Sequence, residues 1–207
     1  MILVLGATGG TGLEVVKQAI SRQWKVRALV RSPDRLASFE RDIEIQQGDL
    51  TSQTDLATAL QGIDAVVSAF GPRNPVPHHE EDLLSRFSVA LISAMGKTQV
   101  KRAVLESTSF LFKDAVLPPA HLFGRMFFAN RVRDSIAMED SFRSSSTDWT
   151  FIRPTRLTDG PKTAKYRKAV GRLPHFAFRI SRADVADAML TALSDPSALR
   201  VAIGVTS

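Results

Sequence analysis

The sequence has no cysteine among its 207 residues, which excludes disulfides, thiolate metal sites and cysteine nucleophiles. No stretch approaches the ~18 consecutive apolar residues of a membrane-spanning helix. The apolar run at 2–5 is too short for the core of a signal peptide, and no basic segment precedes it. We therefore expect a cytoplasmic protein that does not act in a membrane.

Length and charge narrow the class of protein further. At 207 residues, of which 44% are apolar, the chain is long enough for one domain with a sizeable core. It carries 27 Lys and Arg against 21 Asp and Glu, a net charge of +6. This excess favours an anionic partner: nucleic acid, an anionic membrane surface or a phosphorylated small molecule.

Short β-branched runs alternate with longer helical patterns along the chain. Strands are expected at 2–5, 26–30, 43–46, 65–68, 103–107, 149–152 and 201–205, and helices at 11–22, 56–60, 80–97, 123–144 and 182–193. Strands separated by helices of this length predict a single α/β domain over residues 1–207, a doubly wound parallel sheet with helices on both faces. Two stretches interrupt the alternation: 71–79, with three prolines, and 160–174, rich in Lys and Arg.

A glycine-rich loop lies between the first strand and the first helix. We expect this loop to hold the pyrophosphate of a dinucleotide, because glycines let the backbone approach closely and a helix N-terminus offers free N–H donors. The alternative is a βα turn that binds nothing. The predicted cofactor-binding residues here are Gly6, Thr8, Gly9, Gly10, Thr11 and Gly12.

The end of the second strand predicts which dinucleotide is bound. An NAD site would place a carboxylate there, but this chain has Arg31, followed by Arg35. A guanidinium suits the 2′-phosphate of NADP(H), which we therefore favour. The alternative is a solvated arginine pair at the start of a helix. Asp49, after the third strand, is either an acceptor for the adenine amino group or an ordinary turn residue.

Four segments together resemble a known family. GATGGTG at 6–12, LVRS at 29–32, GDL at 48–50 and DWTFIRP at 148–154 are similar to the atypical short-chain dehydrogenases with NmrA-like NAD(P)-binding domains, over residues 1 to about 195. Segments 71–75, 107–112 and 116–119 resemble the flavin reductase (biliverdin-IXβ reductase) branch. The resemblance implies cofactor contacts from Arg31, Arg35, Asp49, Leu50, Gly71 and Arg73, and places Ser109 beside the nicotinamide.

The chain departs from this family at Thr155, where the flavin reductase branch has an active-site histidine. We expect Ser107, Pro154 and Thr155 to line the cofactor site as well. The only tyrosine, Tyr166, is followed four positions later by Val170, so the Tyr-x-x-x-Lys pair of carbonyl-reducing short-chain dehydrogenases is missing. The window 125–135, where isoflavone-reductase-like enzymes use a lysine, holds only arginines as basic residues.

Hydride transfer to a planar conjugated acceptor needs little more than stacking, exclusion of water and one hydrogen-bond donor. Ser109, supported by Thr108, is our candidate donor; the alternative is a polar strand end in a βα turn. The aromatic and aliphatic residues Phe110, Leu111, Phe112, Leu122, Phe123, Phe127 and Phe128 line a pocket for the acceptor or pack onto the core. The substrate loops are expected at about 71–80, 109–123 and 155–175.

Two further features are not assigned a role in the chemistry. His78 and His79 are expected to be solvated and to bind no metal. The basic cluster at 162–172 is a solvated face, a contact for the anionic tail of a substrate, or a contact for nucleic acid, which we do not expect.

The sequence thus predicts an NADPH-dependent oxidoreductase that reduces a flavin, a quinone or a tetrapyrrole-like acceptor, as a monomer or small homo-oligomer. The alternatives are a non-catalytic NADP(H)-binding redox sensor of NmrA type and, more weakly, a sugar-type epimerase.

Overall fold

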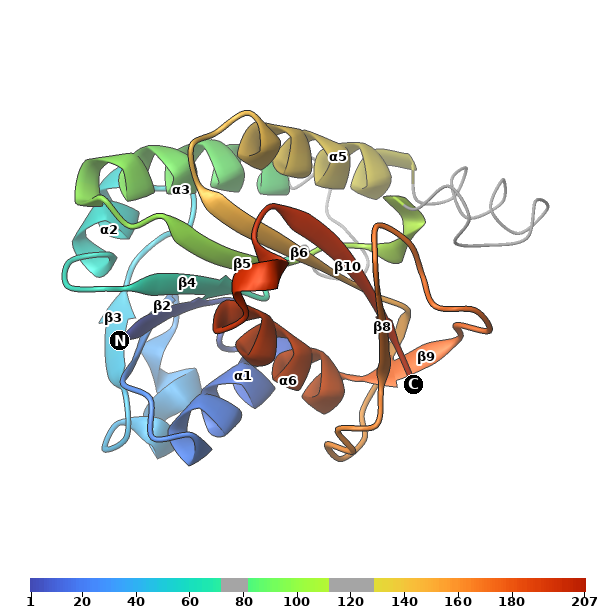
Figure 1. Ribbon diagram of the computed structural model, residues 1–207. Coiled ribbons are helices and arrows are strands. Elements are labelled where there is room, and N and C mark those ends of the chain that lie inside the picture. The colour runs from blue at the N-terminus through green and yellow to red at the C-terminus, as the bar shows by residue number, and fades with distance from the viewer. Residues whose placement is uncertain (72–81, 112–128) are drawn as a thin grey trace.

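A computed structural model describes residues 1–71, 82–111 and 129–207 of the chain (Figure 1). Within these ranges one sheet has eight strands in the order β3-β2-β1-β4-β5-β6-β10-β8. The strands are β1 (Ile2–Leu5), β2 (Val26–Val30), β3 (Glu44–Gln47), β4 (Ala65–Ser68), β5 (Arg102–Glu106), β6 (Asp148–Pro154), β8 (Arg167–Val170) and β10 (Val201–Thr206). All neighbouring pairs are parallel except β8 with β10. The predicted doubly wound sheet is therefore confirmed, with one antiparallel edge strand added.

Helices cover both faces of the sheet because its central strands are apolar on both sides. α1 (Gly10–Ser21) and α6 (Arg182–Leu193) lie on one face, and α2 (Gln53–Ala59), α3 (Leu83–Thr98) and α5 (Ala129–Arg143) lie on the other (Figure 1). Along β1, Val4 packs with the α1–α6 side, whereas Leu3 and Leu5 pack with the other. Two apolar layers thus hold the sheet between helices. Shorter helical turns are η1 (Pro33–Phe39), η3 (Ser109–Leu111) and η4 (Pro196–Ala198).

The expected loop 160–174 contains a strand that the sequence did not predict. β8 pairs with β10 through Arg167–Val170, and β7 (Arg156–Thr158) pairs with β9 (Arg179–Ser181) in a separate two-stranded sheet. The segment RKAV has three exposed positions and no apolar alternation. Pairing with β10, and not local pattern, makes it a strand. Its neighbour on β10, Gly204, has no room for a Cβ, which would lie 2.3 Å from the Arg172 carbonyl oxygen.

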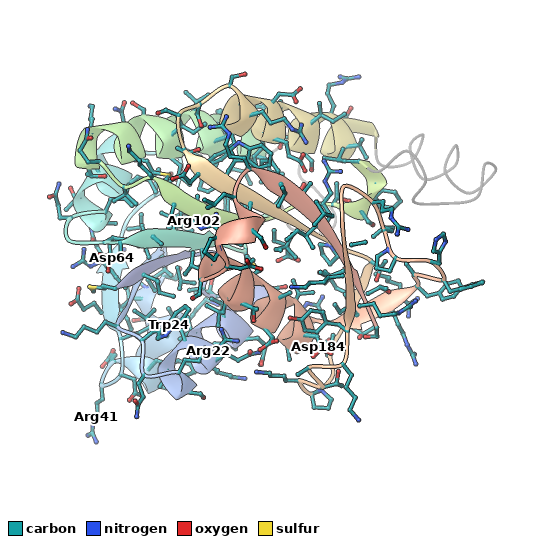
Figure 2. All side chains as sticks on the ribbon, in the orientation of Figure 1. Arg22, Trp24, Arg41, Asp64, Arg102 and Asp184 are labelled. Atoms are coloured by element: carbon teal, nitrogen blue, oxygen red, sulfur yellow. The ribbon has the colours of Figure 1, made fainter. Side chains whose placement is uncertain are left out.

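Helix α6 is fixed at both ends (Figure 2). At its start, the Ser181 hydroxyl accepts from the Asp184 backbone N–H, and the buried Asp184 carboxylate accepts from the backbone N–H groups of Thr163 and Ala164 at 2.8 and 2.9 Å. At its end, Arg102 of β5 donates to the carbonyls of Ala192 and Leu193. The first turn of α6 packs beside the second half of α1, where Gln18 donates to the Ala183 carbonyl, and the Arg182 side chain reaches from there to Gly10.

Within the described ranges, no helix combines the length and apolar character that crossing a bilayer requires.

Candidate functional site

The glycine loop follows β1 at the point where the strand order reverses, between β1 and β4. In open sheets of this kind, ligands bind beyond the carboxyl ends of the strands at this switch point. Gly6 has φ +76°, and a Cβ there would lie 2.6 Å from the Ala69 carbonyl oxygen. A Cβ on Gly12 would lie 2.0 Å from the carbonyl oxygen of Gly6, whereas the Gly9 N–H donates to that oxygen at 2.9 Å. The tight turn therefore needs glycine at both positions.

The N-terminus of α1 is open toward this crevice. Its cap residue, Gly9, has no side chain to occupy the free N–H groups, and the first turn contains no acidic residue. Gly9 and Gly10 are exposed, and Thr8 is partly buried. A backbone cradle with unoccupied N–H donors at a helix N-terminus fits the pyrophosphate of a dinucleotide.

The predicted 2′-phosphate arginines lie beside this loop. Arg35, in η1, donates to the Thr8 carbonyl at 3.3 Å and so reaches across to the glycine loop. Arg31 follows β2 and is exposed. Hydrogen bonds from Thr51, aided by the charge of Arg31, lower the pKa of Asp49 and keep it ionised. Because both arginines are exposed, they are cations available to a ligand at one end of the crevice.

Asp49 forms a turn with its own neighbours. Its Oδ1 accepts from the backbone N–H of Thr51 at 2.8 Å and from the Thr51 hydroxyl at 2.9 Å. Its backbone N–H donates to Asp55 in the first turn of α2, and the adjacent Leu50 is buried. Asp49 is exposed, so its carboxylate is accessible to a ligand.

A partly buried acid lies beside the glycine loop. Glu106, the last residue of β5, accepts a hydrogen bond from the Thr11 hydroxyl at 3.4 Å. Burial raises the pKa of Glu106 from 4.5 to about 7, although the Thr11 hydrogen bond and the charge of Arg182 oppose the rise. Arg182 opens α6, and its side chain lies over Gly10, where a Cβ would be 2.6 Å from the Arg182 Cδ. The N-terminus of α1, the acid Glu106 and the cation Arg182 therefore meet at one place.

The Ser107 hydroxyl points away from this acid, to the opposite face of the sheet. It donates to Glu139 of α5 at 2.6 Å, and Glu139 is fully buried. Arg153 donates to both oxygens of Glu139 at 2.9 and 2.5 Å, and Arg143 donates to one at 2.5 Å. The Ser107 hydroxyl is thus part of a buried ion-pair network, although the residue stands at the carboxyl end of β5.

Thr108 and Ser109 follow directly and are partly buried. Thr108 accepts from the Phe110 backbone N–H at 3.4 Å, and Ser109 begins η3. Pro154 pairs with Val205 of β10, and the buried Thr155 donates its hydroxyl to Thr206 at 3.2 Å. The hydroxyls of four predicted residues, Thr11, Ser107, Thr108 and Thr155, thus have hydrogen-bond partners within the fold.

Tyr166 donates its hydroxyl to Asp187 of α6 at 3.0 Å. Burial, together with the charge of Asp187, raises the pKa of Tyr166 well above its usual range. This phenol therefore holds its proton firmly, which agrees with the absence of a Tyr-x-x-x-Lys pair. Asp187 also pairs with Lys162 at 2.5 Å, so one member of the basic cluster is bound to α6.

Several predicted features lie outside the described residues: Arg73, most of the loop 71–80, Phe112, Leu122, Phe123, Phe127, Phe128, His78 and His79. Gly71 is described and exposed. In the described part of the chain, no group of three or more His, Asp or Glu residues is arranged to hold a metal ion.

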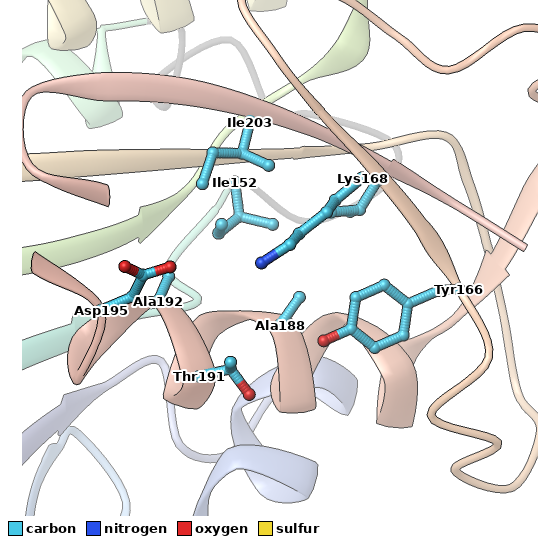
Figure 3. Close-up of a pocket in the computed structure, with 9 residues that line it drawn as sticks. Ile152, Tyr166, Lys168, Ala188, Thr191, Ala192, Asp195 and Ile203 are labelled. Atoms are coloured by element: carbon cyan, nitrogen blue, oxygen red, sulfur yellow. The ribbon is translucent and has the colours of Figure 1, made fainter. Parts of the chain in front are cut away.

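A small pocket between the C-terminal half of α6 and the sheet is separate from the crevice (Figure 3). It is lined mainly by β10, β8 and α6, with Lys168 and Tyr166 extending into it. Its volume of about 20 Å³ suits a water molecule and is far too small for a nucleotide. None of the predicted cofactor residues lines it.

Three residues of the crevice were not predicted from the sequence: Glu106, Arg182 and Asp159, whose Oδ1 lies 2.5 Å from the Arg182 Nη1. One signal was available. Arg182 follows the capping residue Ser181, and a cation in the first turn of a helix opposes the helix dipole unless an anion lies nearby.

The fold and the open glycine loop at its switch point define a dinucleotide-binding domain of Rossmann type. The comparison with known families agrees, because the profile of the NAD(P)H-binding family matches residues 6–196. The chain belongs to this family, and its dinucleotide is NAD(P)H.

Individual relatives are similar over most of this chain. An uncharacterised chloroplast protein of Arabidopsis thaliana is 32% identical over 171 residues, which are 78% of this chain and 61% of that protein. The (4-alkanoyl-5-oxo-2,5-dihydrofuran-3-yl)methyl phosphate reductase of Streptomyces griseus is 32% identical over 74% of this chain and 47% of its own length. This chain thus spans about half to three fifths of these two relatives. Among solved structures, the anaerobilin reductase ChuY of Escherichia coli O157:H7 superposes with a TM-score of 0.82 at 21% identity, covering 99% of this chain and 96% of that one, and shares the fold.

Proposed function

We propose that the protein is an NADPH-dependent reductase that transfers hydride to a planar conjugated acceptor: a flavin, a quinone or a tetrapyrrole. The observation that carries the proposal is the open glycine loop with Arg31 and Arg35 at one end and the Thr108–Ser109 turn following β5. The name of the Streptomyces griseus relative, a reductase, supports the reaction class. The cytoplasmic location and the monomeric or small homo-oligomeric state stay predictions.

Different residues along the crevice would bind different parts of the dinucleotide and the acceptor. Arg31 and Arg35 bind the 2′-phosphate, Gly9, Gly10 and the first turn of α1 bind the diphosphate, and the bound nicotinamide supplies the hydride. Ser109, partly buried at the start of η3, donates a hydrogen bond to the acceptor and favours the charge that develops there. Tyr166 takes no part, because its proton is held by Asp187.

One assay tests the reaction class. NADPH oxidation is followed by absorbance with flavin mononucleotide, a quinone, a tetrapyrrole and a diaryl carbonyl as acceptors. We expect turnover with at least one of the first three and none with the carbonyl. In Ser109→Ala, kcat should fall about 10-fold or more while NADPH affinity stays the same. Ser141→Ala, at a partly buried position of α5, is the matched control, since its hydroxyl donates to the Ala137 carbonyl within the helix. Unchanged turnover in Ser109→Ala would remove the proposed role of this hydroxyl.

A specific observation favours a second candidate, a non-catalytic redox sensor. The hydroxyls of Ser107 and Thr155, both expected at the cofactor site, are bonded to Glu139 and Thr206 within the fold. Tight NADPH binding with no turnover on any of the acceptors would establish the sensor and reject the reductase.

A further inference from the structure

The first turns of α1 and α6 are joined by one side chain. The aliphatic part of Arg182 fills the space above Gly10, where a Cβ would be 2.6 Å from Cδ and 2.8 Å from Nε. Gly10 is the first residue of α1 and belongs to the loop that fits a diphosphate. The contact therefore brings a guanidinium from a remote part of the sequence to the edge of the phosphate cradle.

The anions around this guanidinium are of two kinds. Asp159, which follows β7, pairs with it at 2.5 Å and is itself 92% exposed, while the Arg182 side chain is 29% exposed. Glu106, on the other side, is within the reach of its charge and accepts from Thr11. An ion pair with so exposed a carboxylate is weak, because water and salt compete with it. Arg182 can exchange Asp159 for another anion at small cost.

A phosphate group is the better partner for Arg182. A guanidinium binds phosphate through paired charge-assisted hydrogen bonds, and such bonds are stronger for a side chain partly shielded from water, as Arg182 is. The position of Arg182 in the first turn of α6 also places it where the helix dipole attracts an anion.

We propose that Arg182 binds the diphosphate of NAD(P)H and that Asp159 holds its guanidinium in the free protein. This inference rests on binding of the dinucleotide at the glycine loop. Asp159 thereby acts as an internal competitor: it orients Arg182 over Gly10 before binding and returns to solvent when the diphosphate takes its place. Arg31 recognises NADPH alone, whereas Arg182 serves NADPH and NADH equally, because both carry the diphosphate.

The test is a set of binding measurements by calorimetry on the full chain. Arg182→Gln should weaken NADPH and NADH by the same factor, about 10-fold to 100-fold, the range for a lost hydrogen bond to a charged group. Binding of 2′-AMP, which has no diphosphate, should not change. Arg179→Gln, an exposed arginine three positions earlier, is the matched control and should bind like the wild type.

Asp159→Asn should change the dinucleotide affinity in the opposite direction, and this measurement does not depend on how well Arg182→Gln folds. Removing the competing carboxylate should tighten both dinucleotides about 2-fold to 5-fold. Unchanged affinity in Arg182→Gln, or weaker binding in Asp159→Asn, would overturn the assignment. If Arg182→Gln instead raised only the KM of flavin mononucleotide, the arginine would serve the phosphate of the acceptor and the assignment would also fail. If the wild-type protein bound neither dinucleotide, the proposed function itself would be refuted. The other contrary results would refute only the role of Arg182.

Discussion

Replacing Glu106 by glutamine should remove a pH-dependent loss of folding stability that arises at the candidate site. Burial raises the pKa of this acid from 4.5 to about 7, so the folded protein binds the proton more tightly than the unfolded chain does. At about 1.36 kcal/mol per pH unit, the ionised carboxylate costs the folded state up to about 3 kcal/mol. Glutamine keeps the shape and the oxygen that accepts from Thr11, but it cannot ionise.

The sign of the effect follows from linkage between protonation and folding. Below about pH 4.5, Glu106 is protonated in the folded and unfolded states, so its ionisation does not lower the free energy of unfolding. Between about 4.5 and 7, the unfolded chain ionises first, so the wild type loses stability as the pH rises. Above that window the loss is constant. Glu106→Gln should therefore match the wild type at about pH 4.5 and exceed it by up to about 3 kcal/mol at about pH 8.

Urea unfolding followed by circular dichroism at several pH values measures this difference. Groups that both proteins share cancel when the two curves are subtracted. Glu40→Gln, at the exposed end of η1, is the control and should differ from the wild type by less than about 0.5 kcal/mol at every pH. A difference between Glu106→Gln and wild type that stays flat from about pH 5 to about pH 8 would refute the reasoning.

Two further substitutions test separate parts of the site. Arg31→Ala should weaken NADPH binding by roughly 1.5–3 kcal/mol and leave NADH nearly unchanged, as measured by calorimetry; equal losses would contradict the 2′-phosphate assignment. Arg153→Met should lower the free energy of unfolding by about 3 kcal/mol, because it leaves the buried Glu139 short of a partner. The double variant Arg153→Met with Glu139→Met should recover part of this loss in the same urea assay, and a larger loss would count against the explanation.

Local signals in the sequence were sufficient to predict the sheet and the glycine loop. Gly6 and Gly12 lie between a strand and a helix within a few residues, and the contact that demands glycine at position 12, with the Gly6 carbonyl, is formed inside the same turn. The contact at Gly6 is with Ala69, which follows β4. The central strands are buried on both faces and so appear as continuous apolar runs.

The rest depends on contacts between distant segments. β8 is a strand only because β10 is its neighbour, and α2 begins at Gln53, capped by Ser52, earlier than the expected start at 56. Glu106, Asp159 and Arg182 come together through the packing of α6 beside α1, which no local pattern encodes. Ser107 stands at the expected strand end, but its hydroxyl is directed by a buried acid on a helix that follows much later.

The two outer strands of the main sheet, β3 and β8, have four residues each and carry exposed charged side chains, including Glu44, Arg167 and Lys168. A sheet edge of this kind offers a poor template for a strand of another molecule, because it is short and charges must be desolvated on pairing. Without β8, the longer and more apolar β10 would stand at that edge. By covering β10, this one polar strand makes the sheet edge poorly suited to ordered aggregation.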